Sequence, residues 1–140
     1  MVADCVPVAL ASAAEGRVAV VHAGWRGIAA GVVQAAVAAF RDPAEVRGAI
    51  GPAVGIDHYE VGPDVAGELA RATGGLAVSG HGAGRPRVDL AGTVRRLLET
   101  AGLSRIERAD LCTACEPSRF YSHRRDGPRT GRQGLIAVRR

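Results

Sequence analysis

The chain of 140 residues contains no lysine, few aromatic residues and no long apolar run. Aromatic side chains make up only 4% of it, while apolar residues reach 47%, so the core has to be built mainly from Val, Leu, Ile and Ala. No run approaches the roughly 18 apolar residues that a membrane helix needs, which argues against a membrane partner. The length predicts one domain spanning residues 1–140.

Positive charge is supplied by arginine alone: all 18 basic residues are arginines, and the formal net charge is +4. The guanidinium fork suits phosphate and carboxylate groups. The arginines are scattered, however, and no aromatic platform accompanies them. We therefore expect no nucleic-acid partner.

Cysteine is also scarce, with three residues at Cys5, Cys112 and Cys115. An odd count without a recognisable signal peptide is typical of a reducing compartment. We therefore expect a cytoplasmic protein.

Two short β-branched and apolar runs, Val6–Ala11 and Arg17–His22, flank a glycine-containing turn and predict a β-hairpin. Their near-continuous apolarity favours strands buried on both faces. Apolar periodicity predicts a helix over Ile28–Phe40. The other expected elements are a strand over Val46–Ile50, helices over Pro63–Ala72 and over Leu90–Ala101 behind an Asp89 cap, and strands over Ile106–Leu111 and Leu135–Val138. Imperfect alternation of strands and helices indicates an α/β or α+β fold with a mixed sheet.

The hairpin has a consequence for Cys5 and His22. In an antiparallel pair the start of one strand lies beside the end of its partner, so these two residues become neighbours. A thiolate and an imidazole can together bind Zn²⁺, or act as a nucleophile and its base. The plainer alternative is a small buried thiol beside a hydrogen-bonding histidine.

The segment after His22 has the sequence Ala-Gly-Trp-Arg-Gly. Its glycines allow close approach of the backbone, and Arg26 places an anion-binding group beside the possible metal ligands just ahead of a helix. The alternative is an ordinary strand-to-helix turn in which Trp25, the only tryptophan, fills space.

Several motifs together resemble the laccase-domain family of zinc-dependent purine nucleoside phosphorylases, once described as polyphenol oxidase-like. The matching segments, in chain order, are 3–8 (ADCVPV), 22–27 (HAGWRG), 50–52 (IGP), 59–61 (YEV), 88–90 (VDL), 112–115 (CTAC), 120–126 (FYSHRRD) and 130–132 (TGR). The resemblance implies a layered α/β/β/α fold with mixed sheets. It also implies phosphorolysis of adenosine, inosine and methylthioadenosine, together with deamination of adenosine.

The resemblance further implies a catalytic zinc with His, Cys and His ligands, of which Cys5 and His22 correspond to the second and third. The first histidine belongs to a Gln-Val-His-type motif that precedes the Ala-Asp-Cys motif and does not occur in this sequence. We therefore expect the chain to be the C-terminal portion of a longer enzyme, with an N-terminal half or a second copy completing the site. Arg26 joins Cys5 and His22 as a catalytic candidate.

Further candidates bind substrate: Asp4 near the metal, and Arg124, Arg125 and Arg132 in a polar C-terminal loop with Ser122 and Thr130. Cys112 and Cys115 have the spacing of half a structural zinc site or of a redox pair, but no second cysteine pair is present, so we favour no metal role for them. The sequence supports no role for the other histidines, namely His58, His81 and His123.

Two other functions remain open at this point. One is oxidation of phenols with copper, which Cys and His can also bind, although four histidines are too few for the several copper ions of a true laccase. The other is a non-catalytic anion-binding or interaction module.

Overall fold

The computed structural model describes residues 1–80 and 84–139. Four strands form its main sheet in the order β2-β1-β3-β6: β1 (Val6–Ser12), β2 (Arg17–Ala23), β3 (Arg47–Ile50) and β6 (Arg105–Arg108). β1 is antiparallel to both β2 and β3, whereas β3 and β6 are parallel. The predicted hairpin and the mixed α/β class are therefore confirmed.

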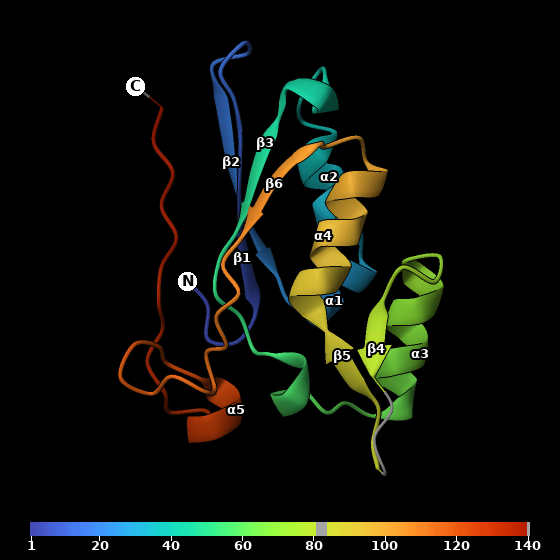
Figure 1. Cartoon of the computed structure of the whole chain (residues 1–140), viewed down its shortest axis with the longest axis vertical. Coiled ribbons are helices and arrows are strands. Elements are labelled where there is room, and N and C mark those ends of the chain that lie inside the picture. Colours follow the sequence, from blue (N-terminus) through green and yellow to red (C-terminus); the bar gives the residue numbers. More distant parts are fainter. Residues whose placement is uncertain (81–83, 140) are drawn as a thin grey trace.

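Helices cover one face of this sheet (Figure 1). They are α1 (Trp25–Ala29), α2 (Val32–Val37) and α4 (Leu90–Thr100), and α2 packs on both β2 and α4. The remaining elements are η1 (Pro43–Glu45), η2 (Ile56–His58), α3 (Pro63–Ala72), the antiparallel ribbon of β4 (Val78–Gly80) and β5 (Arg87–Asp89), and α5 (His123–Asp126).

The core lies between the sheet and the helical layer. β1 contributes Val6, Val8 and Leu10, and α4 contributes an apolar stripe that includes Val94 and Leu98; all five are at most 1% exposed. α4 follows its predicted course, because the Asp89 side chain caps it by accepting from the Gly92 N–H at 2.8 Å. This packing fixes the sheet against the helices and holds the ends of β1 and β2 in place.

The predicted single helix over Ile28–Phe40 is wrong as a continuous element. α1 ends at Ala29 and α2 starts at Val32, and between them Gly31 adopts φ 80°. A left-handed residue cannot continue a right-handed helix, and glycine adopts that conformation without the steric cost of a Cβ. The apolar spacing still identified residues of the buried face, because Ile28, Val33 and Val37 are all buried.

Gly31→Ala is expected to lower the free energy of unfolding by about 1–2 kcal/mol, the cost of a left-handed conformation for an L-residue with a Cβ. The measurement is urea denaturation followed by circular dichroism. The matched control is Gly67→Ala inside α3, where an added Cβ meets no atom within 4 Å. That variant should gain roughly 0.5–1 kcal/mol from helix propensity; equal effects at both positions would contradict the argument.

Two strand predictions also need correction. β2 is not buried on both faces: Val18 and Val20 are 36% and 48% exposed, whereas Val21 and Ala23 pack into the core. The helices cover only one face of the sheet, so alternate β2 side chains point outward.

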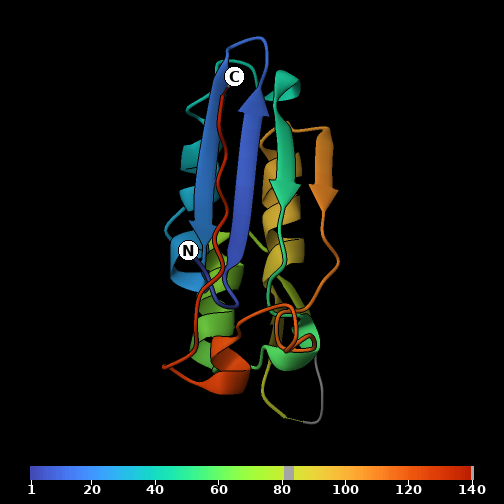
Figure 2. The ribbon, with the colours of Figure 1, turned by 90° about the vertical axis from the view of Figure 1, so that its left-hand side faces the viewer.

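Residues Leu135–Val138 do not form a strand. They run as an extended segment along the outer face of β1 and β2 (Figure 2), where Arg139 Nη1 donates to the Gly16 carbonyl at 3.1 Å.

The expected strand over Ile106–Leu111 is instead β6, displaced toward Arg105. Residues 81–83 of the predicted glycine-rich loop Gly80–Arg87, with His81 among them, lie outside the described residues. Among residues 1–80 and 84–139, no helix combines the length and the apolar character needed to cross a membrane.

Candidate functional site

Cys5 and His22 lie together at the end of the hairpin. The antiparallel register pairs Val6 with Ala23 and Pro7 with His22, which brings Cys5 to the level of Gly24. A Cβ placed on Gly24 would lie 2.9 Å from Cys5 Sγ and 3.9 Å from His22 Nε2. The thiol and the imidazole therefore flank one point beside Gly24, as the hairpin argument predicted.

The same two side chains line an open pocket of about 330 Å³ with Gly24, Trp25, Arg26 and Gly27. The Arg26 guanidinium stacks over the Trp25 ring, with its carbon 4.5 Å from the ring centre. This contact is a cation–π interaction that positions the charge at the pocket wall. A thiol, an imidazole and a guanidinium thus share one concave surface.

A larger hollow of about 560 Å³ lies over the outer face of β1, β3 and β6. Arg47, Arg105 and Glu107 supply its charged groups, and neither cysteine nor histidine lines it. Volume alone would favour this hollow as the functional site. The donor chemistry favours the smaller pocket, because a metal or a nucleophile needs the side chains found there.

The electrostatic surroundings of Cys5 oppose ionisation. Burial raises the pKa of its thiol, the neighbouring Asp4 carboxylate raises it further, and the Arg132 guanidinium partly offsets both. Without a cation in the pocket, the thiol is therefore neutral at pH 7. A positive ion would supply the missing stabilisation of the thiolate.

Asp4 joins the start of β1 to the C-terminal loop. Its side chain is 6% exposed, and its backbone takes φ 82°, a left-handed conformation that Asp tolerates better than most residues. One carboxylate oxygen accepts from Thr113 Oγ1 and the other from the Arg124 N–H, both at 2.6 Å. These bonds make Asp4 a positioning residue for its neighbour Cys5 and for the C-terminal loop; its predicted contact with substrate stays a prediction.

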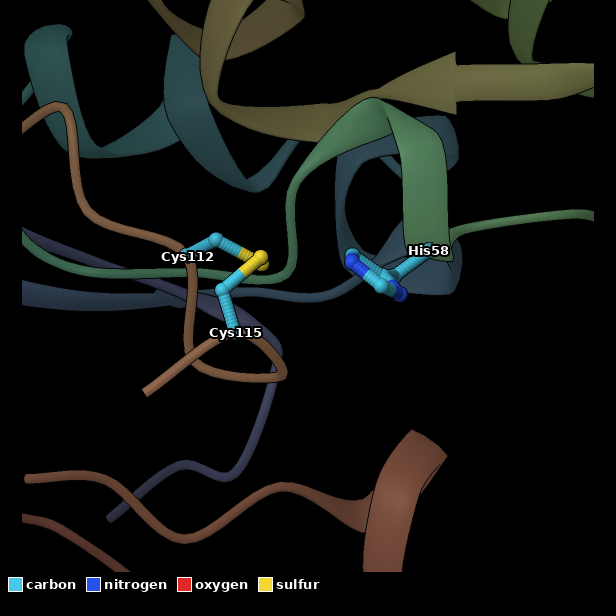
Figure 3. Close-up of side chains that lie close together, drawn as sticks. All are labelled: His58, Cys112 and Cys115. Carbon is cyan, nitrogen blue, oxygen red and sulfur yellow. The ribbon is translucent and has the colours of Figure 1, made fainter. Parts of the chain in front are cut away.

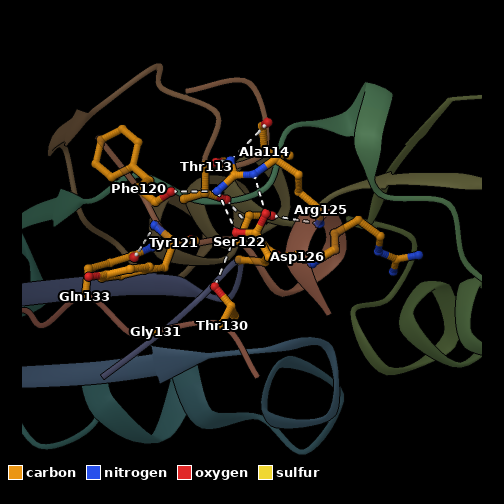
Figure 4. A network of polar contacts seen from close by, with 12 residues as sticks. Thr113, Ala114, Phe120, Tyr121, Ser122, Arg125, Asp126, Thr130, Gly131 and Gln133 are labelled. Carbon is orange, nitrogen blue, oxygen red and sulfur yellow. Dashed lines mark hydrogen bonds and ion pairs between the residues drawn. The ribbon is translucent and has the colours of Figure 1, made fainter. Parts of the chain in front are cut away.

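Arg125, on α5, makes hydrogen bonds with neighbouring parts of the C-terminal region, as Figure 4 shows. Its Nε and Nη2 donate to the two oxygens of Asp126, each at 2.7 Å. The other guanidinium hydrogens go to the carbonyls of Thr113, Ala114 and Phe120. All five donors of the guanidinium are thus used within the chain; the predicted contact of Arg125 with substrate stays a prediction.

Arg124 and Arg132 lie closer to the thiol pocket. The Arg124 guanidinium stacks 4.9 Å from the centre of the Tyr59 ring and donates to the Glu60 carbonyl at 3.0 Å. Arg132 donates to the carbonyls of Thr130 and Gly131, each at 2.8 Å, and its charge acts on Cys5. Both remain predicted substrate-binding residues.

Tyr59 is a site residue to which the sequence argument assigned no role. Burial raises the pKa of its hydroxyl, and the ionisable groups that influence this pKa are Arg124, Cys5, Asp4 and Arg26. These groups come from three separate parts of the chain, so Tyr59 lies where they converge. The Tyr-Glu-Val segment was the only sequence signal for it.

The pair Cys112 and Cys115 has a third partner. His58, at the end of η2, places a ring nitrogen within 4.8 Å of both sulfur atoms. The absence of a second cysteine pair was therefore no argument against a metal, because a histidine from a distant segment supplies a further donor. His123 begins α5 and is exposed.

Comparison with known proteins shows the family and supports the fold. A sequence model of the family described as multi-copper polyphenol oxidoreductase laccase matches residues 1–140. The chain belongs to this family. A Neisseria meningitidis protein of known crystal structure has the same mixed fold as this laccase-family chain. The two structures align with a TM-score of 0.81 at 37% sequence identity, over 91% of this chain and 54% of that one.

Curated relatives of the laccase-family chain are named for reactions of nucleosides. A purine nucleoside phosphorylase of Xylella fastidiosa is 43% identical, over 98% of this chain and 54% of that protein. A protein from an unknown prokaryotic organism, named adenosine deaminase RL5, is 35% identical over 93% of this chain and 53% of its own length. The chain spans about half the length of the relatives it matches.

Proposed function

We propose that this chain carries part of the active site of a zinc-dependent purine nucleoside phosphorylase that acts on adenosine, inosine and methylthioadenosine and also deaminates adenosine. The reaction breaks the glycosidic bond of the nucleoside and forms a bond between the ribose carbon and a phosphate oxygen. The names of two relatives, purine nucleoside phosphorylase and adenosine deaminase, support this proposal. The observation that carries it is the convergence of Cys5 Sγ and His22 Nε2 on one point beside Gly24.

The donors in this pocket fit zinc. A thiolate and an imidazole are both common zinc ligands, and they face one point that the missing side chain of Gly24 leaves open. Cys5 and His22 would hold the ion, with a further ligand from an N-terminal half or from a second copy of the chain. When bound, zinc supplies Lewis-acid chemistry: it polarises oxygen and lowers the pKa of water toward ~7.

The remaining side chains bind and orient the substrates. Arg26 lines the same pocket, with its guanidinium held on Trp25, and offers paired N–H donors to phosphate. Arg132 and Arg124 add positive charge near Cys5 and Tyr59, where an anionic substrate would be attracted. Asp4 keeps the first strand and the C-terminal loop together, so these charges stay near the thiol.

The test is an assay of the purified chain with adenosine and phosphate, alone and mixed with the N-terminal half of the Xylella fastidiosa relative. We expect release of adenine that requires phosphate, formation of inosine, and zinc near stoichiometric by elemental analysis. Activity only in the mixture would show that another segment completes the site. A folded, zinc-loaded mixture without adenine release would contradict the proposal.

The family description names a copper oxidoreductase, which makes phenol oxidation the second candidate. The same preparation separates the two: stoichiometric copper with oxidation of phenols would favour the second reaction. If neither metal binds and phosphate still does, the third possibility, an anion-binding module, would be favoured.

A further inference from the structure

A second group of metal-binding side chains lies apart from the Cys5 pocket. His58, Cys112 and Cys115 each offer one ligand atom, and the three atoms lie within 4.8 Å of one another. Figure 3 shows the two sulfur atoms side by side, with the His58 ring turned toward them. The three residues come from η2 and from the turn after residue 111, segments that the Cys5 pocket does not include.

The distances are close to those that one ion requires. With sulfur at about 2.3 Å and nitrogen at about 2.0 Å from a tetrahedral zinc, ligand atoms of one site are roughly 3.5–3.8 Å apart. The side chains therefore have to close by only about an ångström to share an ion. Cys115 and His58 are exposed, so their rotamers can adjust without disturbing the core.

The backbone around Cys112 is arranged as a thiolate site requires. The Gly55 N–H donates to Cys112 Sγ at 3.2 Å, and the Cys115 N–H closes a turn by donating to the Cys112 carbonyl at 3.2 Å. A Cβ on Gly55 would lie 3.2 Å from the same sulfur, so glycine leaves room for it. The turn keeps both thiols of the Cys-x-x-Cys segment on one side, the spacing found in zinc sites.

We propose that His58, Cys112 and Cys115 form a second metal site, which binds a thiophilic divalent cation such as Zn²⁺ with its fourth position open to water. The bound ion would tie η2 to the turn at residues 112–115. Both segments adjoin the first site, because Tyr59 follows His58 and Thr113, which donates to Asp4, lies between the two cysteines. The ion would therefore act structurally, holding the loops around the Cys5 pocket, and it does not depend on the reaction proposed above.

The test is a Co²⁺ titration of the reduced whole chain, followed by competition with Zn²⁺. Cobalt bound by thiolates gives a charge-transfer absorption band, and we expect Cys5→Ser to retain a thiolate-bound equivalent. Cys115→Ser and His58→Ala, both at exposed positions that should not endanger folding, are expected to weaken that equivalent at least 10- to 100-fold, the range that even outer-shell changes around a metal produce. His123→Ala is the matched control, an exposed histidine on α5 that should change nothing.

A second measurement addresses the structural role. Zn²⁺ should raise the melting temperature of Cys5→Ser, because an ion that binds only the folded state stabilises it, and should not raise that of Cys5→Ser/Cys115→Ser. Unchanged cobalt binding in Cys115→Ser and His58→Ala would overturn the proposal. So would a Cys112–Cys115 disulfide that persists under reducing conditions and excludes metal.

Discussion

Replacing Gly24 with alanine should lower the proposed nucleoside phosphorolysis about 10- to 100-fold, a loss typical of changes beside a metal site, while the fold stays intact. The backbone of Gly24, with φ −82° and ψ 169°, suits alanine, so the change adds no backbone strain. The new methyl group would stand 2.9 Å from Cys5 Sγ and 3.9 Å from His22 Nε2, in the space where the two donors converge. It would therefore keep the thiol away from the proposed metal rather than unfold the chain.

The measurements are kcat/KM for adenosine in the active preparation, zinc content and the urea midpoint. Gly67→Ala is again the control, since its added Cβ lies in open space on α3 and should leave activity and zinc unchanged. Full activity of Gly24→Ala with a normal zinc content would show that the point beside Gly24 is not where the metal and substrate meet. A large fall in the urea midpoint would instead identify Gly24 as a packing residue.

Replacing Asp4 with alanine is expected to lower the free energy of unfolding by about 3 kcal/mol. Two hydrogen bonds to a charged acceptor are lost, each worth roughly 1.5 kcal/mol or more, and the buried Thr113 hydroxyl loses its acceptor. Because Asp4 joins residues 109 and 120 positions away, the C-terminal loop should also become more sensitive to protease. Chemical denaturation and limited proteolysis measure the two effects.

Asp4→Asn measures the contribution of the negative charge, because asparagine has nearly the same shape as aspartate but is neutral. Asparagine tolerates the left-handed φ of this position, so this variant should lose less stability than the alanine variant. Its amide oxygen can accept from the Arg124 N–H and its amide nitrogen can donate to the Thr113 hydroxyl, but the negative charge is gone. Asp110→Asn is the control, because that carboxylate is 81% exposed and surface ion pairs contribute about 0–1 kcal/mol. If Asp4→Ala and Asp110→Asn lowered the free energy of unfolding by the same small amount, Asp4 would not anchor the C-terminal loop.

The sequence predicted the features that depend on local chemistry. Proline at the start of α3 and the Asp89 cap of α4 set the beginnings of these helices, and both predictions are confirmed. The hairpin also followed from the two β-branched runs, and with it the nearness of Cys5 and His22. Two secondary-structure predictions were wrong for local reasons as well. The helix over Ile28–Phe40 is interrupted because Gly31 adopts a left-handed conformation, and Leu135–Val138 is not a strand because it pairs with no other strand within the described residues.

Contacts between distant segments were decided by the tertiary structure alone. No periodicity relates His58 to Cys112 and Cys115, and none relates Asp4 to Thr113, because these pairs meet only after β3 and β6 have packed beside β1. The partners of the five Arg125 donors are a further example, because the carbonyls and Asp126 that accept from them come together only in the folded chain.

The amino-acid sequence by itself determined the donor types, the hairpin that brings Cys5 near His22, and the membership in a family, since these follow from residue identity and short spacings. Only the tertiary structure decided which donors are free, which are spent on internal hydrogen bonds, and that a histidine joins the Cys-x-x-Cys segment. The physical reason is that a ligand set or an anchor depends on distances between atoms from separate segments. Those distances exist only once the core has fixed the strands and loops in place.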